Sequence, residues 1–331
     1  EKLRPVENLF DFGFFISFFP QLVAGPIVRA TDFIPQMRKK LKLTAHQFSH
    51  ALFLIMGGLF KKAVISDYIS VNFVDRVFDN PALYSTFEVW GAFYGYAMQI
   101  YCDFSGYSDM AIGLALLMGF HLPINFDTPY RAKSLTEFWR RWHISLSSWL
   151  RDYLYISLGG NRHGKYRTYI NLMITMLLGG LWHGASWKFV MWGALHGTLL
   201  AVERALKPLL NKIPQGARLV PGWFFTFHFV VFAWIFFRAD SFATSRVFIR
   251  QMFSGIDWKL AMEVVTAYPW VFGLIALGYI LHFIPNKVDL TAERWFSHFP
   301  IPAKALVLAL IIWIVIQASS ADVVPFIYFQ F

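Results

Sequence analysis

The stretch that decides the fold class is YINLMITMLLGGLWHGASW, residues Tyr169–Trp187, which contains no charged side chain. A helix needs about 20 predominantly apolar residues to cross the hydrocarbon core of a bilayer, and this stretch approaches that length. The basic segment Asn161–Arg167 precedes it, and a second apolar run, Phe189–Val202, follows before the basic segment Glu203–Arg218. Since short loops rich in Lys and Arg remain in the cytoplasm, the two apolar runs are predicted to form a hairpin that leaves the cytoplasm and returns.

The same hairpin places a histidine near the far side of the membrane. His183 follows Arg167 by sixteen residues, which corresponds to roughly 24 Å of helix in a hydrocarbon core about 30 Å thick. We therefore expect His183 to face the outer half of the membrane, or a funnel that opens there.

The composition of the whole chain is typical of a polytopic α-helical membrane protein. Of its 331 residues, 56% are hydrophobic and 15% are charged, whereas soluble domains average about 45–50% apolar and about 25% charged residues. No linker or repeat divides the chain, which predicts a single domain over residues 1–331. Further apolar segments recur along it: Leu9–Ala24, Phe48–Tyr68, Phe87–Tyr101, Met110–Phe120, Trp223–Phe237, Val271–Ile284 and Ala305–Ala318.

These segments predict an all-α fold of about seven to nine crossing or re-entrant helices. Leu9–Ala24 contains Pro20 and is followed by Gly25-Pro26. Because proline interrupts helical hydrogen bonding, we expect a broken or re-entrant helix there.

The formal net charge of +10 arises from 30 Lys and Arg against 20 Asp and Glu. The basic residues fall mostly in short loops between apolar runs, as membrane orientation requires, so we expect no nucleic-acid partner. The phosphates of anionic lipids or of an acyl carrier would be attracted to those loops, and Lys61-Lys62 is expected to extend to a membrane interface. Cys102 is the only cysteine, which excludes an intrachain disulfide and a thiolate metal cluster.

The segment between Gly119 and Gly160 is more polar and contains a helix signature. Ser134-Leu135-Thr136-Glu137 fits a capping box, with Ser134 at the cap and Glu137 at the third helical position. Glu137 and Arg141 are spaced as a favourable i,i+4 pair. We predict one amphipathic helix at the membrane boundary, with Phe138, Trp142, Ser145 and Trp149 on one stripe and Trp139, His143 and Leu150 on the next.

His143 and His183 are the candidate catalytic residues, because imidazole titrates near neutral pH and polar groups inside a bilayer are costly. His183 stands beside Gly179, Gly180 and Gly184, and glycines on one helical face leave a space for a neighbouring helix or for a substrate channel. The alternative is a packing histidine at position 183, and a residue on the wet face of its helix at position 143. We expect no bound metal, since neither histidine has a partner at ligand spacing.

Asp103 and Asp109 interrupt two apolar runs, and intramembrane carboxylates are usually functional. Six residues apart, they do not share a helical face, although Gly106 would permit a helix break between them. The alternative is a polar hinge bonded internally, for example to Arg131 or Arg141.

Five motifs follow one another along the chain: Phe19–Arg29 (FPQLVAGPIVR), Gln99–Asp109 (QIYCDFSGYSD), Phe138–His143 (FWRRWH), Leu181–Gly184 (LWHG) and the tail Pro325–Phe331 (PFIYFQF). In this order they resemble the membrane-bound O-acyltransferase (MBOAT) family, most of all its bacterial branch typified by the membrane subunit of alginate O-acetylation. The likeness covers nearly the whole chain. Bacterial members usually carry further apolar helices ahead of Gly25-Pro26, so we expect that the N-terminal helices of the full-length family are missing here.

The resemblance implies an enzyme that moves an acetyl group from a cytoplasmic thioester donor to an extracytoplasmic hydroxyl. The donor would be acetyl-CoA or an acyl-carrier thioester, with no bound cofactor, and the acceptor an exported or cell-surface polysaccharide. The family's invariant histidine matches His183, and its second, motif-embedded histidine matches His143. The surrounding residues would bind substrate: Trp139, Arg140, Arg141, Trp142, Trp182, Asp103 and Asp109.

The resemblance further implies a multi-pass protein of the bacterial cytoplasmic (inner) membrane, with an extracytoplasmic partner of the SGNH-hydrolase type that completes delivery to sugar hydroxyls. D-alanyl transfer to teichoic acid is the sister chemistry and an alternative activity. From another class, the alternative is a transporter or flippase that uses Asp103, Asp109 and Lys61 as a charge relay. A non-catalytic scaffold that recruits an export complex is a third.

Overall fold

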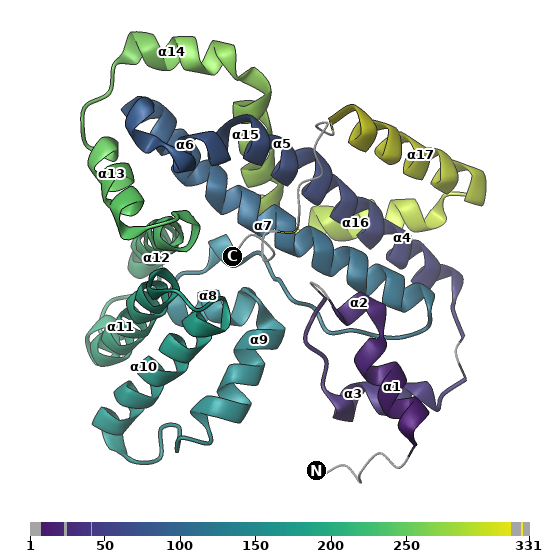
Figure 1. Cartoon of the computed structure of the whole chain (residues 1–331). Coiled ribbons are helices and arrows are strands. Elements are labelled where there is room, and N and C mark those ends of the chain that lie inside the picture. Colours follow the sequence, from purple (N-terminus) through teal and green to yellow (C-terminus); the bar gives the residue numbers. More distant parts are fainter. Residues whose placement is uncertain (1–7, 23–24, 41, 319–325, 327–331) are drawn as a thin grey trace.

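The structure is a computed structural model that describes residues 8–22, 25–40, 42–318 and 326, and every regular element in these ranges is helical (Figure 1). The expected all-α fold is therefore confirmed for this part of the chain. The first helices are α1 (Leu9–Ser17), α2 (Phe19–Leu22), α3 (Ala30–Met37), α4 (Ala45–Leu59), α5 (Asp67–Ile69) and α6 (Asp75–Asp79). Those in the middle are α7 (Thr86–Leu117), α8 (Leu135–Arg141), α9 (Ile144–Trp149), α10 (Gly164–Trp182), α11 (Trp187–Leu210) and α12 (Gln215–Arg238). The last are α13 (Phe242–Met252), α14 (Trp258–Ala267), α15 (Pro269–Phe283), α16 (Asn286–His298) and α17 (Ile301–Ala318).

The centre of the molecule is α7, a helix of 32 residues that lies beside the continuous helical stretch Ala45–Asp79 (Figure 1). Two π-helical turns, Phe60–Ser66 and Ser70–Val74, join α4 to α5 and α5 to α6. The two helices touch where Gly58 faces Gly106, since a Cβ on Gly58 would lie 2.5 Å from the Gly106 carbonyl oxygen. Small residues at this crossing allow the backbones to approach.

The long α7 corrects the sequence prediction of two separate segments, Phe87–Tyr101 and Met110–Phe120. The polar stretch between them stays helical, and no break occurs at Gly106. Asp103 and Asp109 are paired with lysines of the neighbouring helix, so their charge is balanced inside the protein and the helix does not have to open to water.

The N-terminal apolar segment Leu9–Ala24 is broken, as its proline predicted. α1 ends at Ser17, Phe18 has extended backbone torsions, and α2 begins at Phe19. Residues 23–24 lie outside the described residues, and re-entry into the membrane stays a prediction.

Among the residues that the structure describes, three helical stretches are long and apolar enough to cross a membrane: Ala45–Asp79, Gly216–Arg238 and Ile301–Ala318. α14 and α15 together form a fourth candidate, bent by 89° at their junction. The expected seven to nine crossing or re-entrant helices thus stay a prediction. Arg238 joins the ends of the first two candidates, Ala45–Asp79 and Gly216–Arg238, with its guanidinium 2.7 Å from Asp75 and 3.3 Å from Asp79.

α10 and α11 pack against each other as a helical hairpin (Figure 1). Neither is among the candidate spans of the described residues, so the crossing of the membrane by this hairpin stays a prediction. A Cβ on Gly180 would lie 2.2 Å from the carbonyl oxygen of Phe189, and a Cβ on Gly193 would lie 2.3 Å from that of Met176. The space beside Gly180 is therefore filled by α11. The sequence leaves two occupants open for this space, a neighbouring helix or a substrate channel. At Gly180 the neighbouring helix is correct, and the substrate channel is wrong.

Candidate active site

The helix expected over the FWRRWH motif is two helices with a break at His143, so the prediction of one continuous amphipathic helix is wrong. His143 adopts a left-handed backbone conformation, with φ +43° and ψ +55°, between α8 and α9. The loop before α8 supplies backbone hydrogen bonds at this point. The Asp127 N–H donates to the Arg141 carbonyl at 2.9 Å, and the Ile144 N–H donates to the Asn125 carbonyl at 2.9 Å. These bonds replace helical ones, and a helical side-chain pattern does not reveal them.

His143 is almost completely buried, with 3% of its surface exposed. Its Nδ1 lies 3.1 Å from Oδ1 of Asn125, and its ring stands edge-to-face against Phe104 of α7 with centroids 4.6 Å apart. Nε2 is buried and has no hydrogen-bond partner among the described residues. Burial lowers the pKa of His143 well below its usual value, and the nearby His183 acts in the same direction. The imidazole is therefore neutral at physiological pH and able to accept a proton.

His183 lies at the C-terminal end of α10, at the turn into α11, and is partly exposed. Its ring contacts Trp182, Trp192 and Phe237, with centroid distances of 5.2, 5.3 and 5.1 Å respectively. Trp182 also meets the ring of His143 at 6.1 Å. The two histidines thus belong to one aromatic cluster, and Trp182 contacts both.

The tryptophans of the FWRRWH motif differ in their surroundings. Trp142 is buried and packs on Trp234, with ring centroids 5.0 Å apart. Trp139 borders the histidine cluster through Trp192, at 5.7 Å. The indole N–H of Trp139 is buried without an acceptor in the described part of the chain. Trp182 is 53% exposed, so Trp139 and Trp182 are the better placed of the three for the substrate contacts that all three were predicted to make.

Asp103 and Asp109 pair with lysines and not with the arginines considered as alternatives. A carboxylate oxygen of Asp103 lies 2.5 Å from Nζ of Lys62, and Asp109 forms an ion pair with Lys61. The expectation of a lysine that extends to an interface is wrong for Lys62, whose side chain is only 8% exposed and is held by a carboxylate of α7. For Lys61, which is 22% exposed, it stays a prediction. Asp103 is connected to the histidines indirectly, because Phe104, its neighbour in sequence, packs on the ring of His143.

Residues 4–244 match the sequence model of the membrane-bound O-acyltransferase family. This chain belongs to the MBOAT family. A probable alginate O-acetylase from Pseudomonas putida is 42% identical over 98% of this chain and 69% of its own length. Another from Azotobacter vinelandii is 47% identical, over 77% of this chain and 50% of its own length. A peptidoglycan O-acetyltransferase from Helicobacter pylori is 43% identical, over 75% of this chain and 47% of its own length. This MBOAT chain therefore spans about half the length of the last two relatives.

The two arginines of FWRRWH in this MBOAT chain also differ. Arg141 is 2.9 Å from Glu137, which confirms the i,i+4 pair, and 3.2 Å from the Asp127 carboxylate. Ser134 accepts the Glu137 N–H at 3.1 Å, which confirms one half of the capping box. The other half is absent, because the Glu137 carboxylate accepts the backbone N–H of the residue before Ser134. Arg140 is exposed. Substrate binding by either arginine stays a prediction, and Arg141 is already held in a structural network.

The sequence predicts no role in the site for Asn125 or Ser145, yet both lie within hydrogen-bonding distance of His143. Both are polar residues in a polar segment, where such side chains are common. The hydroxyl of Ser145 accepts the backbone N–H of Ile27 at 3.0 Å. The first MBOAT motif, Phe19–Arg29, is thereby tied to the residues that surround the buried histidine.

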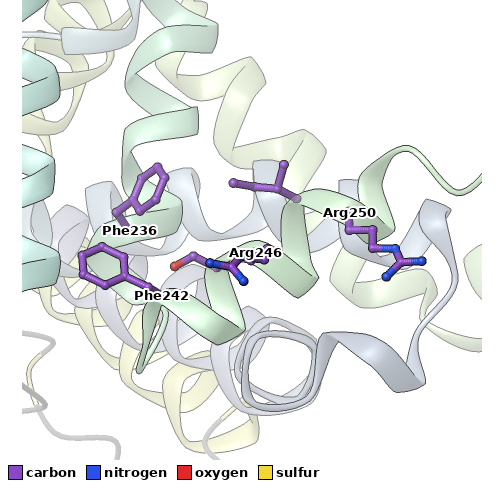
Figure 2. A pocket seen from close by; sticks show the side chains of 6 residues that line it. Phe236, Phe242, Arg246 and Arg250 are labelled. Atoms are coloured by element: carbon purple, nitrogen blue, oxygen red, sulfur yellow. The ribbon is translucent and has the colours of Figure 1, made fainter.

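A hollow of about 440 Å³ lies elsewhere, between the end of α12 and the face of α13 (Figure 2). Its lining contains no histidine, so we do not assign it to the acyltransferase site. The residues that line it are Phe236, Phe242, Ser245, Arg246, Ile249 and Arg250.

Proposed function

We propose that this protein is a membrane O-acyltransferase that acetylates hydroxyl groups of an exported or cell-surface polysaccharide. The observation that carries the proposal is the meeting of His143 and His183 in one aromatic cluster, where Nε2 of His143 is buried and without a partner in the described ranges. The names of the relatives, alginate O-acetylase and peptidoglycan O-acetyltransferase, support an acetyl group and a glycan acceptor.

The proposed reaction starts from a thioester donor, acetyl-CoA or an acyl carrier, that arrives from the cytoplasm. A neutral imidazole takes the proton of the acceptor hydroxyl while the hydroxyl oxygen attacks the thioester carbonyl carbon. A C–O bond forms, the C–S bond breaks, and the proton passes to the departing thiolate. The buried indole N–H of Trp139 is the donor that we propose for the oxyanion.

We further propose that the chain is a multi-pass protein of the bacterial cytoplasmic membrane, with His183 toward the outside. Basic residues precede both Ala45–Asp79 and Gly216–Arg238, which favours a cytoplasmic start for each span. The ends of these spans meet at Arg238. Lys188, in the first turn of α11, donates to the Ala239 carbonyl at 3.3 Å, so the turn that contains His183 lies at that same end. An extracytoplasmic partner of the SGNH-hydrolase type would complete delivery to the glycan.

Mass analysis of surface glycans, from cells with and without the full-length gene, tests the reaction and the substrate together. We expect O-acetyl esters that depend on the gene, because no other product follows from an acetyl thioester and a glycan hydroxyl. D-alanyl esters in their place would favour the sister chemistry. Glycans that are identical in both strains would contradict the proposal.

A further inference from the structure

Asn125 binds its neighbours in a way that fixes the orientation of its amide. The side chain is 1% exposed. Its Oδ1 accepts the backbone N–H of Ser145 at 3.3 Å and the Ser145 hydroxyl at 2.9 Å, while its Nδ2 lies 3.1 Å from the hydroxyl of Ser108 on α7. Because a backbone N–H can only donate, the atom that faces Ser145 must be the amide oxygen.

This orientation decides where His143 carries its proton. The amide oxygen of Asn125 has lone pairs only, and Nδ1 of His143 lies 3.1 Å from it. Nδ1 must therefore carry the hydrogen, and in a neutral imidazole the lone pair is then on Nε2. Nε2 is the buried ring nitrogen that lacks a partner among the described residues.

The backbone at this point is held by the same residue. His143 has a positive φ of +43°, a conformation that is uncommon for residues other than glycine and that persists only when the surroundings impose it. The carbonyl of Asn125 accepts the N–H of Ile144, the next residue, at 2.9 Å. The backbone carbonyl and the side-chain amide of Asn125 therefore both fix the position of His143.

We propose that Asn125 is a positioning residue, which holds His143 in the Nδ1–H form so that Nε2 is the ring nitrogen able to accept a hydrogen bond or a proton during acyl transfer. The proposal rests on the proposed acyltransferase function, and Asn125 lies outside all five motifs through which the chain resembles its family. Ser108 and Ser145 secure the amide from α7 and α9, so the same residue joins the central helix to the site.

Two substitutions at position 125 separate positioning from simple packing. Asn125→Leu keeps the branched shape and the number of side-chain heavy atoms and removes the acceptor, and we expect kcat to fall by about 10²–10⁴-fold, the range of general acid–base catalysis, with the KM for the donor changed less than about threefold. Asn125→Asp keeps an oxygen that accepts from Nδ1, and should retain activity within about tenfold of the parent.

The matched control is Asn171→Leu. Asn171 is also buried, and its amide donates to the carbonyls of Leu158 and Gly160 at 3.1 and 2.9 Å. Its loss should cost stability and leave kcat unchanged. Equal losses of kcat in Asn125→Leu and Asn171→Leu would overturn the positioning role, as would an Asn125→Asp variant that folds but is as inactive as Asn125→Leu.

A spectroscopic measurement distinguishes a failure of the Asn125 proposal from a failure of the proposed acyltransferase function. The full chain has ten histidines, and ¹⁵N spectra of histidine-labelled protein, with His143→Asn used for assignment, report which nitrogen of His143 is protonated. We expect Nδ1–H in the parent and a mixture of both forms in Asn125→Leu. A parent with Nε2–H would overturn the inference even if acetyl transfer is confirmed. A parent with Nδ1–H and no acetyl transfer would contradict only the proposed function.

Discussion

Replacing His183 with alanine is expected to lower acetyl transfer by about 10²–10⁴-fold, the contribution of a general acid–base group, without lowering the amount of protein in the membrane. His183 is a partly exposed residue at the α10–α11 turn, so its truncation to alanine should disturb the fold less than the loss of a fully buried side chain. The measurement is transfer from a labelled acetyl thioester in membranes, with abundance determined by immunoblot. His163→Ala is the matched control, because His163 lies exposed in the loop before α10.

The outcomes of this substitution discriminate among the classes of function. Retained acetyl transfer in His183→Ala would remove the site assignment. Lost polymer export with normal acetylation would favour a transporter, in which the Lys61–Asp109 pair is the remaining candidate for a charge relay.

The second large effect is a loss of stability, expected when an ion pair between α7 and the stretch Ala45–Asp79 is removed. Lys62 lies 2.6 Å from Asp67 and 2.5 Å from Asp103, and the side chains of Lys62 and Asp103 are 8% and 3% exposed. Lys62→Met takes the shared cation away from both carboxylates and should lower the free energy of unfolding by about 3–5 kcal/mol, as is usual when one partner of a buried pair is removed. Thermal unfolding of the purified protein in detergent measures the change.

An exposed ion pair provides the control for Lys62→Met. Arg151 is 63% exposed where it pairs with Asp152 at 2.6 Å, so Arg151→Met should change the free energy of unfolding by about 0–1 kcal/mol. If both variants unfold at the temperature of the parent, the charges of Lys62 and Asp103 are solvated, and the proposed role of the pair in joining the helices is incorrect.

The apolar helices and their pairing could be predicted from the sequence. The apolar run Tyr169–Trp187 predicts a helix and α10 is observed at Gly164–Trp182, because an uninterrupted apolar run is a signal that is local in the sequence. α13 and α16 were not predicted, since neither contains a long apolar run.

The parts that escaped prediction depend on contacts between distant segments. The break at His143 follows from backbone bonds to residues before α8, and helical periodicity contains no trace of them. The continuity of α7 depends on lysines contributed by another helix. Asn125 is an ordinary polar residue in the sequence, and only the fold shows that its amide faces an imidazole.

The central claim is that His143 and His183 act as one site, and a double-substitution cycle on acetyl transfer tests it most directly. His143→Asn suits the left-handed backbone, because asparagine tolerates that conformation, and His183→Ala removes the second imidazole. If the two histidines act as a unit, the double variant should transfer acetyl no more slowly than the slower single variant, since residues that act together are strongly non-additive. A double variant whose loss equals the product of the two single losses would contradict the claim.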